Sequence, residues 1–171
     1  QLLETRVEKV LLDAEAFNLL ENGRFEGELL PKSWLLTPHP GELGRILGRQ
    51  ASEINQDRPG FARKAQSKLN AVVLLKGFRT LVADEKLTSV ILSGNSALGK
   101  AGSGDVLAGF IAGLWSQSMK TREAALLGAY LHGFVATKYV REGNDPATLI
   151  PSRIIEFLPK IMSDIRKKKN R

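Results

Sequence analysis

The chain has 171 residues, a formal net charge of +7 at pH 7 and no cysteine. Its length fits a single domain, and the lack of cysteine excludes disulfides and thiolate metal sites and suits a reducing cytoplasm, where we expect the protein. No apolar stretch reaches the roughly 18 residues that a membrane span requires, so we predict no membrane association.

Short apolar runs alternate with helical segments in the first half of the chain. Strands are predicted over 7–12, 34–37 and 71–75. The run 71–75 is apolar throughout, as expected of a strand covered on both faces. Helices are predicted over 14–20, 42–47 and 61–69, and a further one begins near Ser52 and is interrupted by Arg58-Pro59-Gly60.

The second half continues this alternation, with strands predicted over 80–83 and 88–92 and helices over 106–115, 122–140 and 153–157. The pattern favours a layered α/β fold in a single domain over residues 1–171. The basic run 166–171 is predicted to be a solvated tail. Much of the positive charge lies in this tail, and basic residues are not interleaved with aromatic ones, so nucleic-acid binding is disfavoured.

The segment 94–113 contains a glycine-rich loop, ending in G-S-G-D, that runs directly into an apolar helix. After its first turn this helix carries no charged residue, so we expect it to be buried inside the protein. Its N-terminus presents free N–H groups and a positive dipole end, which together form an anion site. Asp105 is then a candidate base. The alternative is a tight turn into a buried helix, with Asp105 as a first-turn acid stabilised by the dipole.

A second motif, T-P-H-P-G-E over 37–42, follows a predicted strand. Two prolines hold His39 in a rigid turn at a strand end, where open α/β sheets bind their ligands. His39 and Glu42 are therefore candidate site residues. As alternatives, His39 is a loop histidine bonded to a neighbouring carbonyl, and Glu42 is a first-turn acid favoured by the helix dipole.

Other candidates are spread along the chain. K-G-F-R-T over 76–80 joins two strands and either contacts phosphate and ribose or forms an ordinary hairpin turn. Asp13 either faces a ligand or caps a helix. His132 is predicted to be a hydrogen-bonded core histidine. Two histidines and no cysteine leave no spacing for a metal cage, although Mg²⁺ held mostly by nucleotide phosphates and water stays open.

Together these motifs resemble the ADP/ATP-dependent NAD(P)H-hydrate dehydratase family, which has a ribokinase-like fold. The resemblance runs from Val10 to about Pro159, and T-P-H-P-G-E is its discriminating part, because other ribokinase-like kinases share G-S-G-D. It implies a three-layer αβα fold with a mostly parallel central sheet. The matching segments are 12–18, 37–42, 52–58, 72–80, 94–109, 124–133 and 147–151.

The resemblance also implies a lyase reaction in nicotinamide nucleotide repair, in which hydrated NADH or NADPH returns to NAD(P)H at the expense of ADP or ATP. Asp105 would be the catalytic base, and His39, Glu42 and Asp105 would bind the hydrate. Glu42 would also organise Mg²⁺ through water, with no direct protein ligand. The implied nucleotide-binding residues are Lys76, Gly77, Phe78, Arg79, Thr80, Asn95, Ala101, Gly102, Ser103 and Gly104.

Some family features have no match. The N-terminal part of the family's domain has no counterpart, so we expect an incomplete domain that acts as a homo-oligomer or with a second polypeptide. Lys100 stands where a small or hydroxyl residue is common. The alternative function is a ribokinase-like kinase of a small molecule such as a vitamin precursor, against which T-P-H-P-G-E argues. A third is a catalytically silent nucleotide-binding subunit.

Overall fold

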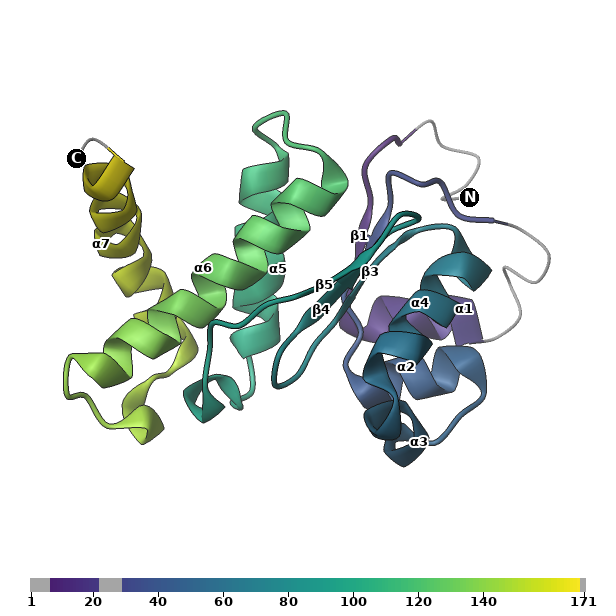
Figure 1. The fold of residues 1–171 in the computed structure, drawn as a ribbon, viewed down its shortest axis with the longest axis horizontal. Coiled ribbons are helices and arrows are strands. Elements are labelled where there is room, and N and C mark those ends of the chain that lie inside the picture. The colour runs from purple at the N-terminus through teal and green to yellow at the C-terminus, as the bar shows by residue number, and fades with distance from the viewer. Residues whose placement is uncertain (1–6, 22–28, 170–171) are drawn as a thin grey trace.

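A five-stranded sheet forms the centre of the computed structural model, which describes residues 7–21 and 29–169 (Figure 1). β1, β2 and β3 pair in parallel, whereas β4 and β5 join the sheet antiparallel, so the described sheet is mixed rather than mostly parallel. Each strand is shorter than its predicted segment; residues 7–9, for example, are exposed. The strands, in their order across the sheet, are β1 (Leu11–Leu12), β2 (Leu35–Leu36), β3 (Val72–Leu75), β4 (Leu81–Ala83) and β5 (Thr88–Val90).

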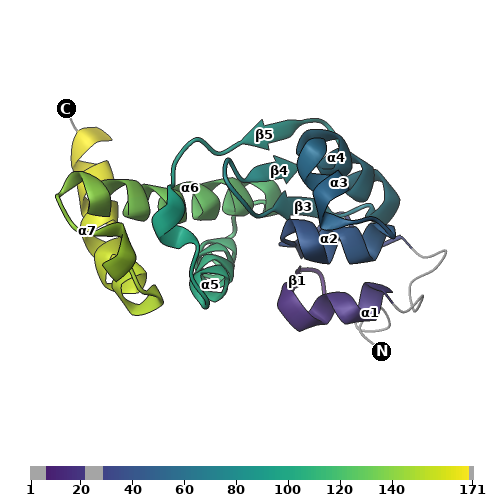
Figure 2. The same cartoon turned by 90° about the horizontal axis from the view of Figure 1, so that it is seen from below.

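Helices lie on both sides of the sheet, with α1 to α4 on one side and α5 and α6 on the other (Figures 1 and 2). The helix α7 packs against α6. The α-helices are α1 (Asn18–Glu21), α2 (Pro40–Leu47), α3 (Ala51–Gln56), α4 (Arg58–Leu69), α5 (Ser103–Trp115), α6 (Thr121–Arg141) and α7 (Pro151–Lys169). The short 3-10 helices are η1 (Ala14–Phe17), η2 (Ser96–Leu98) and η3 (Pro146–Thr148).

The hydrophobic core divides into two parts because neighbouring strand residues point to opposite faces of the sheet. One face packs on α5 and α6 through Leu35, Val72, Leu74 and Val82. The other packs on α2 to α4 through Val73, Leu75, Leu81 and Ala83. The predicted α/β class with three αβα layers is confirmed. The carboxyl ends of β1, β2 and β3 then carry the segments 13–17, 37–42 and 76–80.

Two helix ends differ from prediction. The predicted interruption between two helices lies at Asp57, between α3 and α4, and not at 58–60. The helix α4 already begins at Arg58, because a proline in the first turn loses no helical hydrogen bond and the Asp57 carboxylate accepts from the Gly60 N–H at 2.9 Å. The run 166–169 is not a tail but the last turn of α7. Buried Ile154 and Ile161 hold this helix against α6, which explains why its regular structure continues into the basic segment.

The helix α5 is buried on one side only, in contrast to the prediction from its apolar sequence. Val106, Phe110 and Ile111 are buried, whereas Gly109, Ala112 and Gly113 are exposed. Apolarity on the second side comes from small residues, which hydropathy alone does not distinguish from core residues. Within the described part of the chain, no helix is both long and apolar enough to cross a bilayer.

Candidate functional site

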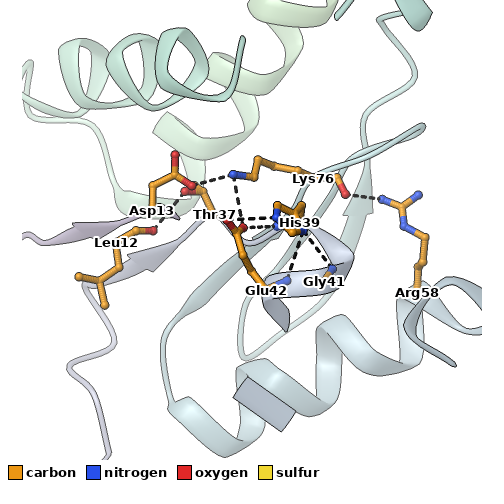
Figure 3. A network of polar contacts seen from close by, with 8 residues as sticks. All are labelled: Leu12, Asp13, Thr37, His39, Gly41, Glu42, Arg58 and Lys76. Atoms are coloured by element: carbon orange, nitrogen blue, oxygen red, sulfur yellow. Dashed lines mark hydrogen bonds and ion pairs between the residues drawn. The ribbon is translucent and has the colours of Figure 1, made fainter. Parts of the chain in front are cut away.

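The T-P-H-P-G-E segment forms the turn between β2 and α2. His39 is the N-cap of α2, and its Nδ1 accepts from the N–H groups of Gly41 at 3.0 Å and Glu42 at 3.2 Å. The Glu42 carboxylate accepts from the His39 N–H at 2.7 Å, which completes a capping box (Figure 3). Thr37 anchors the turn through its hydroxyl, which donates to the Leu12 carbonyl at 3.1 Å. The prolines and these bonds together hold the turn rigid.

This capping fixes the proton position on His39. Because two N–H groups point at Nδ1, the proton of the neutral ring lies on Nε2, which is 3.3 Å from Glu42 Oε1. Gly41 is required here, since a Cβ would lie 2.9 Å from the imidazole Cε1. The alternative in which His39 bonds a neighbouring carbonyl is therefore wrong. Its side chain is still 52% exposed, so the ring can contact a ligand as well as cap the helix.

Lys76 connects this turn to other parts of the site. Its N–H donates to the Pro38 carbonyl, and its ammonium lies 2.7 Å from the Asp13 carboxylate and 3.6 Å from that of Glu42 (Figure 3). Asp13 makes no side-chain cap bond, so the helix-cap alternative is wrong, and its carboxylate pairs with Lys76 instead. On its other side the ammonium lies close to the first turn of α5: a Cβ added to Gly104 would be 3.6 Å from Nζ.

The glycine loop forms the N-terminus of α5. Gly102 is its N-cap with φ of +80°, and a Cβ there would lie 3.1 Å from the Pro151 ring. Ser103 Oγ lies 3.1 Å from Nε2 of buried His132, in agreement with the predicted hydrogen-bonded core histidine. Burial is the main cause that lowers the pKa of His132 to about 4, so its ring is neutral at pH 7. Asp105 is exposed in the first turn.

A cleft of about 600 Å³ lies between the β3–β4 hairpin, the segment 91–99, α5 and α6. This volume is within the range of small-molecule sites. His132 lines it too. Ala101, Gly102, His39, Glu42 and Asp105 are not among its lining residues. The predicted nucleotide-binding residues that do line it are Lys76, Gly77, Phe78, Arg79, Thr80, Asn95, Ser103 and Gly104.

Some of these residues also have structural roles. The Asn95 side chain donates to the Ala136 carbonyl and accepts from the Ala97 N–H, both at 3.0 Å, so its amide holds the loop. Lys100 is half-buried and its ammonium donates to the Pro146 carbonyl at 3.4 Å. Arg58 was not singled out from the sequence, although it binds the 76–80 loop from behind. Its position at the end of the 52–58 motif is the signal that could have identified it.

The sequence matches the NAD(P)H-hydrate dehydratase family over residues 1–160. A curated relative, the ADP-dependent (S)-NAD(P)H-hydrate dehydratase of Neisseria meningitidis, is 39% identical over 148 residues, which are 85% of this chain and 50% of the relative. The chain spans between 21% and 53% of the length of such curated relatives.

Solved structures agree with this match. The ADP/ATP-dependent NAD(P)H-hydrate dehydratase of Bacillus subtilis, co-crystallised with ATP/Mg²⁺, aligns with a TM-score of 0.79 at 31% identity, over 91% of this chain and 55% of that chain. A ribokinase-like superfamily protein of Enterococcus faecalis aligns with a TM-score of 0.75 at 26% identity, over 90% and 52%. The fold is ribokinase-like, and the chain belongs to the NAD(P)H-hydrate dehydratase family.

Proposed function

We propose that this chain carries the site of an ADP- or ATP-dependent NAD(P)H-hydrate dehydratase, a hydro-lyase. The observation that supports this most directly is the position of Lys76. Its ammonium lies between the carboxylates of the T-P-H-P-G-E side and the N-terminus of α5. Phosphoryl transfer to a hydroxyl requires the two reactants side by side, and this arrangement joins a nucleotide cleft to a second cluster of polar groups.

On the nucleotide side, ADP or ATP would occupy the cleft behind the 76–80 loop. The N–H groups of Ala101, Gly102 and Gly104 at the start of α5 would hold the transferring phosphoryl group, where the helix dipole favours negative charge. The Ser103 N–H donates instead to the Lys100 carbonyl at 3.1 Å. The Lys76 ammonium would add a positive charge at the same end of the cleft. Thr80 closes the loop through its hydroxyl, which donates to the Gly77 carbonyl at 3.1 Å.

On the hydrate side, His39 and Glu42 would bind the hydrated nicotinamide and Asp105 would accept its hydroxyl proton. The hydroxyl oxygen forms a bond to the terminal phosphorus, and the bond from that phosphorus to the nucleotide breaks, releasing AMP from ADP or ADP from ATP. The C–O bond of the phosphate ester then breaks as the ring nitrogen donates its electron pair. Phosphate leaves, and proton loss from the neighbouring carbon restores NAD(P)H.

Mg²⁺ would neutralise phosphate charge during this transfer. Among residues 7–21 and 29–169, no group of three or more histidine, aspartate or glutamate side chains is suited to hold a metal ion. Glu42 is also engaged by His39 and Lys76. The nucleotide phosphates and water are therefore the fitting ligands, with Glu42 in contact only through water.

The assembly of the site is a further part of the proposal. Residues 1–171 would act as one domain, either in a homo-oligomer or with a second polypeptide that supplies the part of the family's domain beyond this chain. Native mass spectrometry of the purified protein distinguishes the two, because it counts chains and gives their masses.

The activity is tested by incubating the folded protein with hydrated NADPH, MgCl₂ and either ADP or ATP, while the absorbance of reduced nicotinamide is followed. We expect recovery of absorbance that requires nucleotide, and none with Asp105→Asn. Lack of recovery with the folded wild-type protein in its native assembly would overturn the proposal. Unchanged turnover in Asp105→Asn would remove Asp105 as the base.

A further inference from the structure

Arg58 binds the back of the 76–80 loop. It is the first residue of α4, and its guanidinium donates to the Lys76 carbonyl at 3.3 Å (Figure 3). It also donates to the carbonyls of Leu75, at 3.3 Å, and Phe78. The three acceptors span the end of β3 and the start of the hairpin turn. A planar guanidinium with several donors in fixed directions is suited to hold several carbonyls at once.

The backbone at position 77 favours glycine and brings the loop close to Arg58. Gly77 has φ of +143°, and a Cβ there would lie 2.9 Å from a terminal nitrogen of the Arg58 guanidinium. Glycine at this position therefore lets the guanidinium lie close to the loop backbone.

The bonds to Arg58 set the direction of the peptide groups in the loop. In a trans peptide a carbonyl and the following N–H point in opposite directions, and the described chain has no cis peptide bond. Because the carbonyls of Lys76 and Phe78 point at Arg58, the N–H groups of Gly77 and Arg79 point away from it. The loop lines the cleft but Arg58 does not, so the guanidinium acts from the side away from the ligand.

The charge of Arg58 has no carboxylate counterpart. Within 7–21 and 29–169 it forms no ion pair, and burial lowers its pKa, although an arginine stays charged at neutral pH. Three polarised carbonyls solvate the terminal nitrogens of this partly buried cation. The positive charge therefore remains behind a loop whose N–H groups point the opposite way, which favours an anion in front of it.

We propose that Arg58 is a positioning residue for nucleotide binding, which directs the N–H groups of the 76–80 loop towards the nucleotide and holds the backbone from which Lys76 extends. The inference rests on the proposed function, since it assigns the cleft to ADP or ATP. In this role Arg58 does not touch the nucleotide and acts on its binding through the loop backbone.

The matched variants are Arg58→Met, Arg58→Lys and Arg63→Met. Arg63 lies on the same helix, is exposed and donates to the Lys86 carbonyl at 3.5 Å, so its loss is the control for removing one arginine charge. Isothermal titration with Mg-ADP and Mg-ATP measures binding. Loss of charged hydrogen bonds predicts at least about tenfold weaker binding in Arg58→Met, incomplete rescue by Arg58→Lys and no change in Arg63→Met.

Two outcomes separate this inference from the proposed function. If the wild-type protein binds neither nucleotide, the proposed function is overturned. If the wild type binds and folded Arg58→Met binds equally well, Arg58 has no positioning role. If Arg58→Met folds poorly, amide hydrogen exchange in Arg58→Lys tests the inference instead. In Arg58→Lys, faster exchange is expected at residues 77–80, and unchanged exchange together with wild-type affinity would overturn the inference.

With the hydrate as second substrate, a positioning role predicts that KM for the nucleotide rises while KM for the hydrate, measured at saturating nucleotide, stays unchanged. An equal rise in both would indicate general loss of structure and would contradict the assignment.

Discussion

The Lys76 ammonium lies 2.7 Å from the Asp13 carboxylate, although 63 residues separate the two in sequence. Their side chains are 19% and 13% exposed. A second pair, Lys32 and Glu85, is 2.5 Å apart but 67% and 51% exposed. Because the two contacts are of similar length, comparing them isolates the effect of burial on an ion pair.

Asp13→Ala is expected to lower the free energy of unfolding by about 2 kcal/mol, because it leaves a largely buried ammonium with only a weaker contact to Glu42. Glu85→Ala is the matched control and is expected to change it by less than about 0.5 kcal/mol. Urea unfolding at pH 7 measures both. If the two variants lose the same free energy of unfolding, burial does not strengthen the ion pair between Lys76 and Asp13.

The capping and ligand-binding roles of His39 can be separated. Asparagine is a strong N-cap, so His39→Asn is expected to keep the free energy of unfolding within about 0.5 kcal/mol, whereas His39→Ala should lose about 1 kcal/mol. Both variants lack the imidazole, so under the proposed function both raise KM for the hydrate and leave KM for ADP, measured at saturating hydrate, unchanged. Normal hydrate kinetics in His39→Asn would assign His39 to capping alone.

His132 predicts a pH dependence of stability. Its pKa is about 4 in the folded protein and 6.5 ordinarily, so as pH falls the unfolded chain takes up the proton first. Stability is therefore full above pH 6.5 and is lost between 6.5 and 4, with a total approaching about 3 kcal/mol. His132→Gln keeps a polar group near Ser103 without titrating. Its unfolding free energy should fall less with acid than that of the wild type, and parallel pH profiles would contradict the buried neutral ring.

Replacing two glycines on neighbouring helices by alanine should change the free energy of unfolding in opposite directions. A Cβ on Gly128 of α6 would lie 2.5 Å from Cγ1 of Ile111, so Gly128→Ala is expected to destabilise the protein by about 1–3 kcal/mol. A Cβ on Gly113 of α5 meets nothing within 4 Å, so Gly113→Ala should stabilise it by about 0.5–1 kcal/mol through helix propensity. Thermal unfolding measures both, and destabilisation by Gly113→Ala would mean that this face is covered in the native assembly.

Local signals identified most of the fold and much of the candidate site. The apolar run that includes Val72–Leu75 and the prolines around His39 determine a strand and a turn through short-range chemistry, so both were predicted near their observed positions. The extension of α7 was missed because its basic end looks solvated, whereas contacts of Ile154 and Ile161 with α6 stabilise it. Tertiary packing of this kind is absent from local patterns.

The contacts of Lys76 could not be derived from spacing either. Asp13, Glu42 and Gly104 come from three separate segments, and only the parallel pairing of β1, β2 and β3 brings the first two beside the lysine. The role of Arg58 was missed for a related reason: its place in the 52–58 motif marks the residue, but its partners are backbone carbonyls, which have no signature in the sequence.

The shared ammonium of Lys76 has a thermodynamic consequence. A polyanion that enters the cleft competes with Asp13 and Glu42 for the same charge, so the electrostatic environment on the far side of the lysine changes when the cleft fills. Occupancy of one half of the site then alters affinity in the other, and linkage requires the effect to be equal in both directions. Two ligands of this site would bind cooperatively rather than independently, with one side chain as the coupling element.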